Sequence, residues 1–160
     1  MTICYSVNRL GMCMPTTYSW VLAQEAYGHF YSEDFPEAVR VARHAQTVAP
    51  RTPCVGAVLA AALEARALGV LGRADKVHAA LQEAEKILDA LDDAIVAASA
   101  FGYDEAQLCF HEGNALTHLG DTKAAWRAQE RALVLMPAAD FMDRALTRLD
   151  LGLNHRNLRY

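Results

Sequence analysis

The sequence has no excess of positive charge: 15 lysines and arginines face 19 aspartates and glutamates, for a formal net charge of −4 over 160 residues. The basic residues are also spread along the chain instead of being gathered in one block. A protein that binds nucleic acid by itself needs a basic face, because released counterions supply most of the affinity. The composition therefore disfavours direct nucleic-acid binding by this chain.

The sequence also lacks an uninterrupted apolar stretch long enough to span a membrane. Its longest apolar run, GAVLAAALEARALGVLG at residues 56–72, is broken by Glu64 and Arg66, which is typical of a core helix. The N-terminal residues show no apolar segment behind a basic start and no small-residue cleavage site, so we expect no signal peptide. These features predict a soluble, cytoplasmic protein with no membrane partner.

Motifs that carry catalysis or hold cofactors are missing as well. The chain has no GxSxG sequence, no phosphate-binding glycine loop and no CxxC pair. Its four cysteines are far apart, which favours reduced and mostly buried thiols. His111 and His118 are seven positions apart, whereas metal-binding histidines on a helix are usually three or four apart. We expect no enzyme activity, metal or cofactor, although a catalytic triad assembled across helices stays open.

What the sequence has in abundance is alanine and leucine, which favour helices and recur at fixed intervals. In residues 106–137, small residues, one large residue, a turn glycine and a final proline follow in order: Gly113, Leu116, Gly120, Ala125, Ala132 and Pro137. This order is similar to the tetratricopeptide repeat (TPR), a pair of antiparallel helices about 34 residues long. The same frame fits residues 19–52 and 58–91, and residues 145–160 begin a fourth, half copy.

The repeat frame predicts an all-α fold, a TPR-like right-handed solenoid of antiparallel helix pairs over residues 17–160. Residues 1–16 form an N-terminal extension to which we assign no structure. Seven helices are expected, at residues 16–31, 35–49, 54–71, 74–91, 103–119, 122–136 and 139–157.

A stack of such pairs exposes a continuous concave groove, lined mainly by the first helix of each pair. The groove-facing frame positions hold Trp20, Gln24, Tyr27, Phe30, Tyr31, Arg66, His111, Asn114, Thr117, His118 and Asp150. Aromatic anchors at one end and hydrogen-bonding groups toward the other predict a protein or peptide partner. Trp20 and Phe30 are as readily interpreted as packing in the terminal core. A clamp for an acidic tail is disfavoured, because Arg66 is the one cation among these positions.

The runs FGYDEAQLCFHEGNALTHLGDTKAAWRAQERAL (residues 101–133) and DRALTRLDLGL (143–153) carry a further resemblance. They resemble the C-terminal TPR domain of actinobacterial helix-turn-helix transcriptional regulators of the Cro/repressor type. The resemblance is best over 72–153, weaker over 17–71 and absent over 1–16. It implies the regulatory or sensor part of a transcriptional regulator. No segment reads as a helix-turn-helix, so the DNA-binding activity of that family is carried over to no residue here.

The C-terminal helix supports an alternative, non-enzymatic function in self-association. Leucines recur along it with no following helix to cover them, whereas a terminal repeat needs a polar outer face. These are Leu146, Leu149, Leu151, Leu153 and Leu158. We expect either a homodimer through this helix or a longer native chain. Substituting both Arg66 and Asn114 with alanine should abolish capture of a foreign peptide and leave such a dimer intact.

Overall fold

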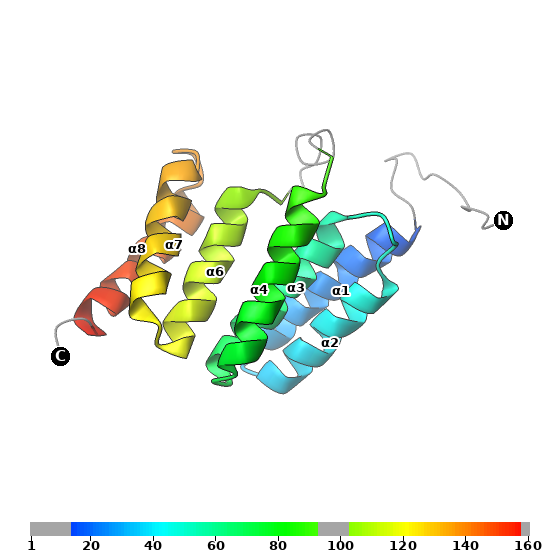
Figure 1. Ribbon diagram of the computed structural model, residues 1–160, viewed down its shortest axis with the longest axis horizontal. Helices are drawn as coiled ribbons and strands as arrows, with labels where there is room; N and C mark the ends of the chain where they lie inside the picture. The colour runs from blue at the N-terminus through cyan, green and yellow to red at the C-terminus, as the bar shows by residue number, and fades with distance from the viewer. Residues whose placement is uncertain (1–13, 93–102, 158–160) are drawn as a thin grey trace.

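The computed structural model describes residues 14–92 and 103–157, which form seven α-helices and no strand (Figure 1). The helices are α1 (Met14–Tyr31), α2 (Phe35–Val48), α3 (Val55–Val70), α4 (Ala74–Asp89), α6 (Glu105–Leu119), α7 (Thr122–Leu135) and α8 (Phe141–Asn157). The predicted all-α class is confirmed, and each helix begins and ends within two residues of the expected position. None of these helices is both long and apolar enough to cross a membrane. Most of the expected N-terminal extension lies outside the described residues, which begin with α1 at Met14, and Leu158 also lies outside them.

The three turns within the predicted helix pairs share one backbone feature. One residue in each turn has a positive φ: Glu33 at 62°, Gly72 at 67° and Gly120 at 86°. Glycine adopts this region at little cost because it has no Cβ, which explains the two turn glycines of the repeat frame. Asp34 and Asp121 follow two of these turns, and their carboxylates accept hydrogen bonds from backbone N–H groups in the first turn of α2 and α7.

Helix α3 is the centre of the molecule and packs against α1, α2, α4 and α6. Almost its whole surface is buried, which is why its sequence is apolar on every side. The two charged residues that interrupt it are both held by neighbours. Glu64 accepts hydrogen bonds from Arg43 Nε at 2.7 Å and from Gln46 Nε2 at 2.8 Å. Arg66 lies on the opposite side of α3, which faces the candidate site.

The small positions of the repeat frame lie in the interior between the helices. Each is buried: Ala26, Ala38, Ala45, Ala65, Val77, Ala84, Gly113, Ala125 and Ala132. Small side chains let two helix backbones approach, which explains why the frame requires them at these intervals.

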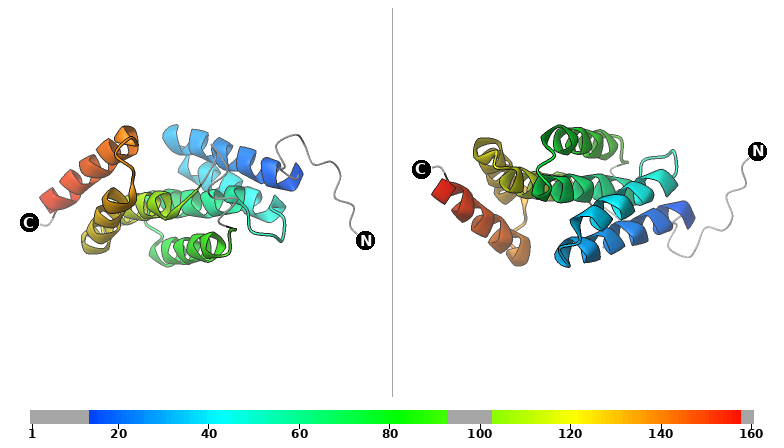
Figure 2. Two further views of the ribbon diagram at one scale, coloured as in Figure 1. Left: turned by 90° about the horizontal axis from the view of Figure 1, so that it is seen from above. Right: turned by 90° about the horizontal axis from the view of Figure 1, so that it is seen from below.

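The first helices of the predicted pairs surround one side of the molecule. Figure 2 shows α1 and α8 on the same side of the α3 and α6 row, with α4 on the opposite side. Residues of α1, α3, α6 and α8 line a common pocket there. The helices that the sequence assigns to the groove therefore do meet around one hollow.

Candidate functional site

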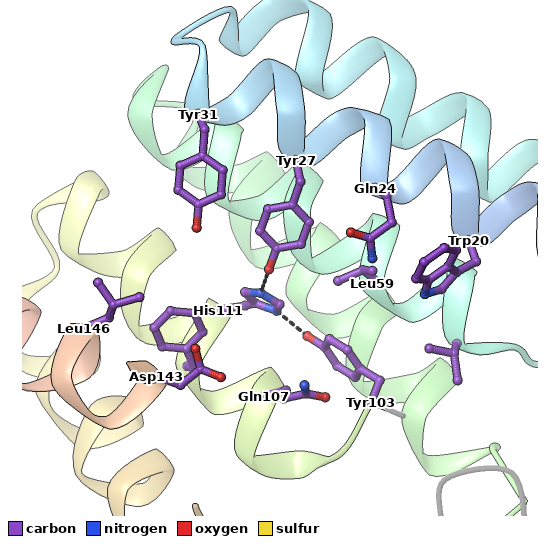
Figure 3. A pocket seen from close by; sticks show the side chains of 12 residues that line it. Trp20, Gln24, Tyr27, Tyr31, Leu59, Tyr103, Gln107, His111, Asp143 and Leu146 are labelled. Atoms are coloured by element: carbon purple, nitrogen blue, oxygen red, sulfur yellow. Dashed lines mark hydrogen bonds between the residues drawn. The ribbon is translucent and has the colours of Figure 1, made fainter. Parts of the chain in front are cut away.

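The pocket has a volume of about 270 Å³, close to the lower end of small-ligand sites. Figure 3 shows side chains of α1 on one wall, α6 on the floor and α8 on the other wall. The lining consists of Trp20, Gln24, Tyr27, Tyr31, Val55, Leu59, Tyr103, Gln107, Phe110, His111, Asp143 and Leu146. It is thus an aromatic hollow with a few polar groups, of a size that suits one or two side chains of a partner.

His111 lies at the centre of the pocket wall, between two tyrosines (Figure 3). Its Nε2 is hydrogen-bonded to the Tyr27 hydroxyl, and its Nδ1 is 2.6 Å from the Tyr103 hydroxyl. A neutral imidazole has one N–H, so His111 donates to one tyrosine and accepts from the other. The Tyr103 ring also stacks on the imidazole, with centroids 5.5 Å apart and planes inclined by 20°. This arrangement fixes α1, α6 and the segment before α6 relative to one another.

Burial keeps all three rings of this group neutral. Desolvation, with a smaller contribution from the charge of Arg66, lowers the pKa of His111 well below its usual value. Burial raises the pKa of Tyr27 to about 12, although Arg66 offsets part of that shift. Burial also raises the pKa of Tyr103 well above its usual value. The group therefore offers hydrogen bonds at neutral pH but no ready base or acid.

The lowered pKa of His111 predicts a loss of stability in acid. The unfolded chain takes up this proton near pH 6.5 and the folded protein does not, so stability is fully present above pH 6.5 and falls below it. The limit is about 1.4 kcal/mol per pH unit for one proton. In His111→Gln this loss should be absent. The difference in free energy of unfolding between wild type and the variant should therefore shrink by about 2 kcal/mol between pH 6.5 and pH 5.

Urea denaturation at a series of pH values measures this effect. His44 is an exposed histidine on α2, so His44→Gln is the matched control: it keeps the buried His111 and should keep the loss of stability in acid that His111 causes. Parallel profiles for wild type and His111→Gln would contradict a buried, neutral His111.

Arg66 lies beside the pocket in a box of aromatic rings. Its guanidinium carbon is 4.4 Å from the centroid of the Phe30 ring. The rings of Tyr27, Tyr31 and Phe110 follow, at 5.7, 5.9 and 5.7 Å. The side chain is only 3% exposed, and its Nη1 has no hydrogen-bond partner among the described residues. A cation over aromatic faces is attracted by the ring quadrupoles, which compensates part of the cost of burying the charge.

A chain of polar contacts extends from Arg66 to α8. Arg66 Nε donates to Asn114 Oδ1 at 2.8 Å, and Asn114 Nδ2 donates to Asp150 Oδ2 at 3.1 Å. These bonds join α3, α6 and α8 through three of the residues that the sequence assigns to the groove. Arg66, Asn114 and Asp150 are thus bonded to one another, and their contribution to the site is to fix the position of α8.

Thr117 belongs to a second polar cluster that connects α6, α7 and α8. Its hydroxyl donates to the Gly113 carbonyl at 2.7 Å and accepts from Gln129 Nε2 at 2.8 Å and Asn154 Nδ2 at 2.9 Å. Asn154 also donates to Gln129 Oε1 at 2.9 Å. Gln129 and Asn154 are buried, and these bonds therefore help to specify how α8 docks.

The structure thus divides the predicted groove residues into three groups. Five line the pocket: Trp20, Gln24, Tyr27, Tyr31 and His111. Four lie beside it in the polar contacts that hold the helices: Arg66, Asn114, Thr117 and Asp150. His118 is exposed, with its ring 6.4 Å from that of Phe30, and Phe30 is buried in the core. Their part in partner binding stays a prediction.

Several pocket residues were not anticipated from the sequence. Tyr103 and Asp143 stand just before the repeat copies that begin at 106 and 145, so the frame excluded them. Gln107 stands at a groove-facing position of the copy that begins at 106 but was not named, and it also forms a capping box with Asp104. An aromatic or acidic residue directly before a frame boundary was the available signal.

A second hollow of about 780 Å³ lies across the molecule, between α4, α6 and Arg131 of α7. The charged residues of its lining are mainly acidic and include Glu85 and Glu112, and Cys109 also lines it. Burial raises the pKa of the Cys109 thiol to about 11, so it is a weak nucleophile at neutral pH. Across residues 14–92 and 103–154, no group of three or more His, Cys, Asp or Glu side chains is placed to hold a metal ion.

Comparisons of the chain with protein-family models, with curated proteins and with solved structures gave no match.

Proposed function

We propose that this chain is a TPR-like scaffold, a right-handed stack of helix pairs, which binds a protein or peptide segment between α1 and α8. The observation that carries the proposal is the aromatic pocket, whose lining combines five groove positions assigned from the repeat frame with α8. Aromatic side chains supply large contact area, and polar groups at the edge fix orientation. By its resemblance to regulator domains, the chain would be the regulatory or sensor part of a transcriptional regulator, a role that would place it in the cytoplasm.

Selection of a displayed peptide library on the purified protein tests this function. Gln24 and Tyr31 are exposed on the pocket wall, so Gln24→Ala with Tyr31→Ala removes contact surface. Because the Tyr31 ring also belongs to the box around Arg66, urea denaturation of the double variant checks that its fold is retained. Recovered peptides should bind the double variant about tenfold or more weakly in calorimetry. Arg66 and Asn114 are unsuitable for this purpose because their substitution disturbs helix packing.

Two exposed residues outside the pocket give matched controls. Tyr18 lies on α1 and Gln82 on α4, so Tyr18→Ala and Gln82→Ala should bind as the wild type does. Peptides that bind the double variant at full strength, or a selection that recovers none, would count against the proposal.

The apolar surface of α8 favours a second candidate function, self-association. Phe141 is 74% exposed and Leu149 is 67% exposed, and Met142 and Leu153 are exposed on the same helix. Contiguous exposed apolar side chains of this kind mark interaction surfaces. This surface could join two copies of the chain while the pocket is left free.

Analytical ultracentrifugation tests self-association. A dimer through α8 should be weakened toward monomer by Leu149→Lys, because a charge would be placed in an apolar contact. The Gln24→Ala and Tyr31→Ala double variant should keep the wild-type sedimentation. A wild-type chain that sediments as a monomer at the highest soluble concentration would exclude this function.

A further inference from the structure

Among the described residues, Asp143 is the one charged residue that lines the aromatic pocket, in the first turn of α8. Its carboxylate forms no hydrogen bond or ion pair with the residues that the structure describes. The hydroxyl of Thr147 donates to the backbone carbonyl of Asp143 and not to its carboxylate. Asp143 is half-buried and faces the hollow between α1 and α6 (Figure 3). A carboxylate in such a place is partly dehydrated without a partner to compensate it.

The aromatic rings of the pocket also favour a positive charge. Trp20, Tyr27, Tyr31 and Phe110 contribute ring surface to the lining. Ring faces attract cations, and the last three of these rings already contact the guanidinium of Arg66. Aromatic surface beside an unpaired carboxylate is the combination that binds ammonium and guanidinium groups.

The charge of Arg66 is the main opposing effect. Arg66 does not line the pocket, and it is connected through Asn114 to the carboxylate of Asp150. That second carboxylate offsets part of the charge of Arg66, and Asp143 supplies a carboxylate in the pocket lining itself. Burial, together with nearby Asp140, raises the pKa of Asp143, which is the effect expected for a carboxylate without a cation.

We propose that the pocket receives a basic side chain, lysine or arginine, of the bound peptide, with Asp143 as its ionic partner and the aromatic rings around its aliphatic part. This inference rests on the proposed peptide-binding function and names the chemistry of the residue at the centre of the bound segment. Asp143 would select for the positive charge of that side chain, and the pocket size would limit the site to one such side chain.

Four acetylated, amidated peptides that differ only in the central residue test the inference: Ser-Ala-Xaa-Ala-Ser, with arginine, lysine, norleucine or glutamate as Xaa. Titration into the ¹⁵N-labelled full chain, followed by amide chemical shifts, gives a dissociation constant for each. The arginine and lysine peptides should bind about tenfold more tightly than norleucine, the uncharged mimic of lysine, and glutamate should bind most weakly.

Asp143→Asn should reduce the arginine and lysine peptides to the affinity of the norleucine peptide. Asp140→Asn is the matched control, because Asp140 directly precedes α8, carries the same charge and does not line the pocket. An unchanged preference in Asp143→Asn, equal binding of all four peptides, or no shift with any of them would overturn the inference. If all four peptides bind equally and shift the amides of the pocket residues, the basic side chain is not selected but the pocket still binds peptides. The proposed peptide-binding function is tested separately, by library selection.

Discussion

Replacing Gly69 with alanine should lower the free energy of unfolding by about 3 kcal/mol. Gly69 lies where α3 meets α6, and a Cβ atom there would be 2.5 Å from the carbonyl oxygen of Ala115 and 3.2 Å from its carbonyl carbon. Those atoms belong to the backbone of a buried helix, so they cannot move aside as a side chain could. The two helices would have to separate, with loss of packing along the floor of the pocket.

Gly28→Ala is the control for this substitution. Gly28 is also within a helix, but a Cβ atom there would have no neighbour within 4 Å. Alanine has the better helix propensity, so this variant should be more stable than wild type by about 0.5–1 kcal/mol. Urea denaturation of the three proteins measures both effects. Equal stability of Gly69→Ala and Gly28→Ala would show that α3 and α6 do not approach as described.

Replacing Arg66 with alanine should lower the free energy of unfolding by about 3–4 kcal/mol. The truncation leaves a cavity among Phe30, Tyr27 and Phe110, and removes the donor to Asn114 Oδ1. Because Asn114 also donates a hydrogen bond to Asp150, the contact between α6 and α8 weakens as well. This is a large effect for a residue that sequence reasoning places on an accessible groove.

Arg66→Met separates the packing contribution from the charge. Methionine has a similar length and packs well against aromatic rings, and it removes a buried guanidinium whose Nη1 lacks a partner. Its stability should be within about 1 kcal/mol of wild type, measured in the same denaturation series. If Arg66→Met proves as unstable as Arg66→Ala, then the charge of Arg66 and not its packing holds the box together.

The sequence was sufficient to predict the helices because their signals are local. Alanine and leucine spacing, Gly72 and Gly120 in turns, and Pro137 at a helix end are properties of neighbouring residues. The burial of the small frame positions follows from the same spacing. Within the described residues, the sequence therefore anticipated the elements and much of the core.

The arrangement of the site was less predictable, because it depends on contacts between distant residues. Arg66 was expected to be accessible, since arginine is rarely buried, but aromatic rings from α1 and α6 enclose it. Asp143 was not considered, because it precedes the half repeat at residues 145–160 and the repeat frame does not predict how α8 is oriented. The Tyr27, His111 and Tyr103 contacts likewise need the mutual positions of α1 and α6, which no local pattern gives.

Mapping of the peptide-binding surface tests the central claim most directly. A peptide recovered by selection would be titrated into the ¹⁵N-labelled chain, and the perturbed backbone amides would be placed on the structure. The account predicts perturbations concentrated at Gln24, Tyr31, Gln107 and Asp143, which line the pocket between α1, α6 and α8. Perturbations gathered instead around Gln82 and Glu85, at the hollow beside α4, would contradict it.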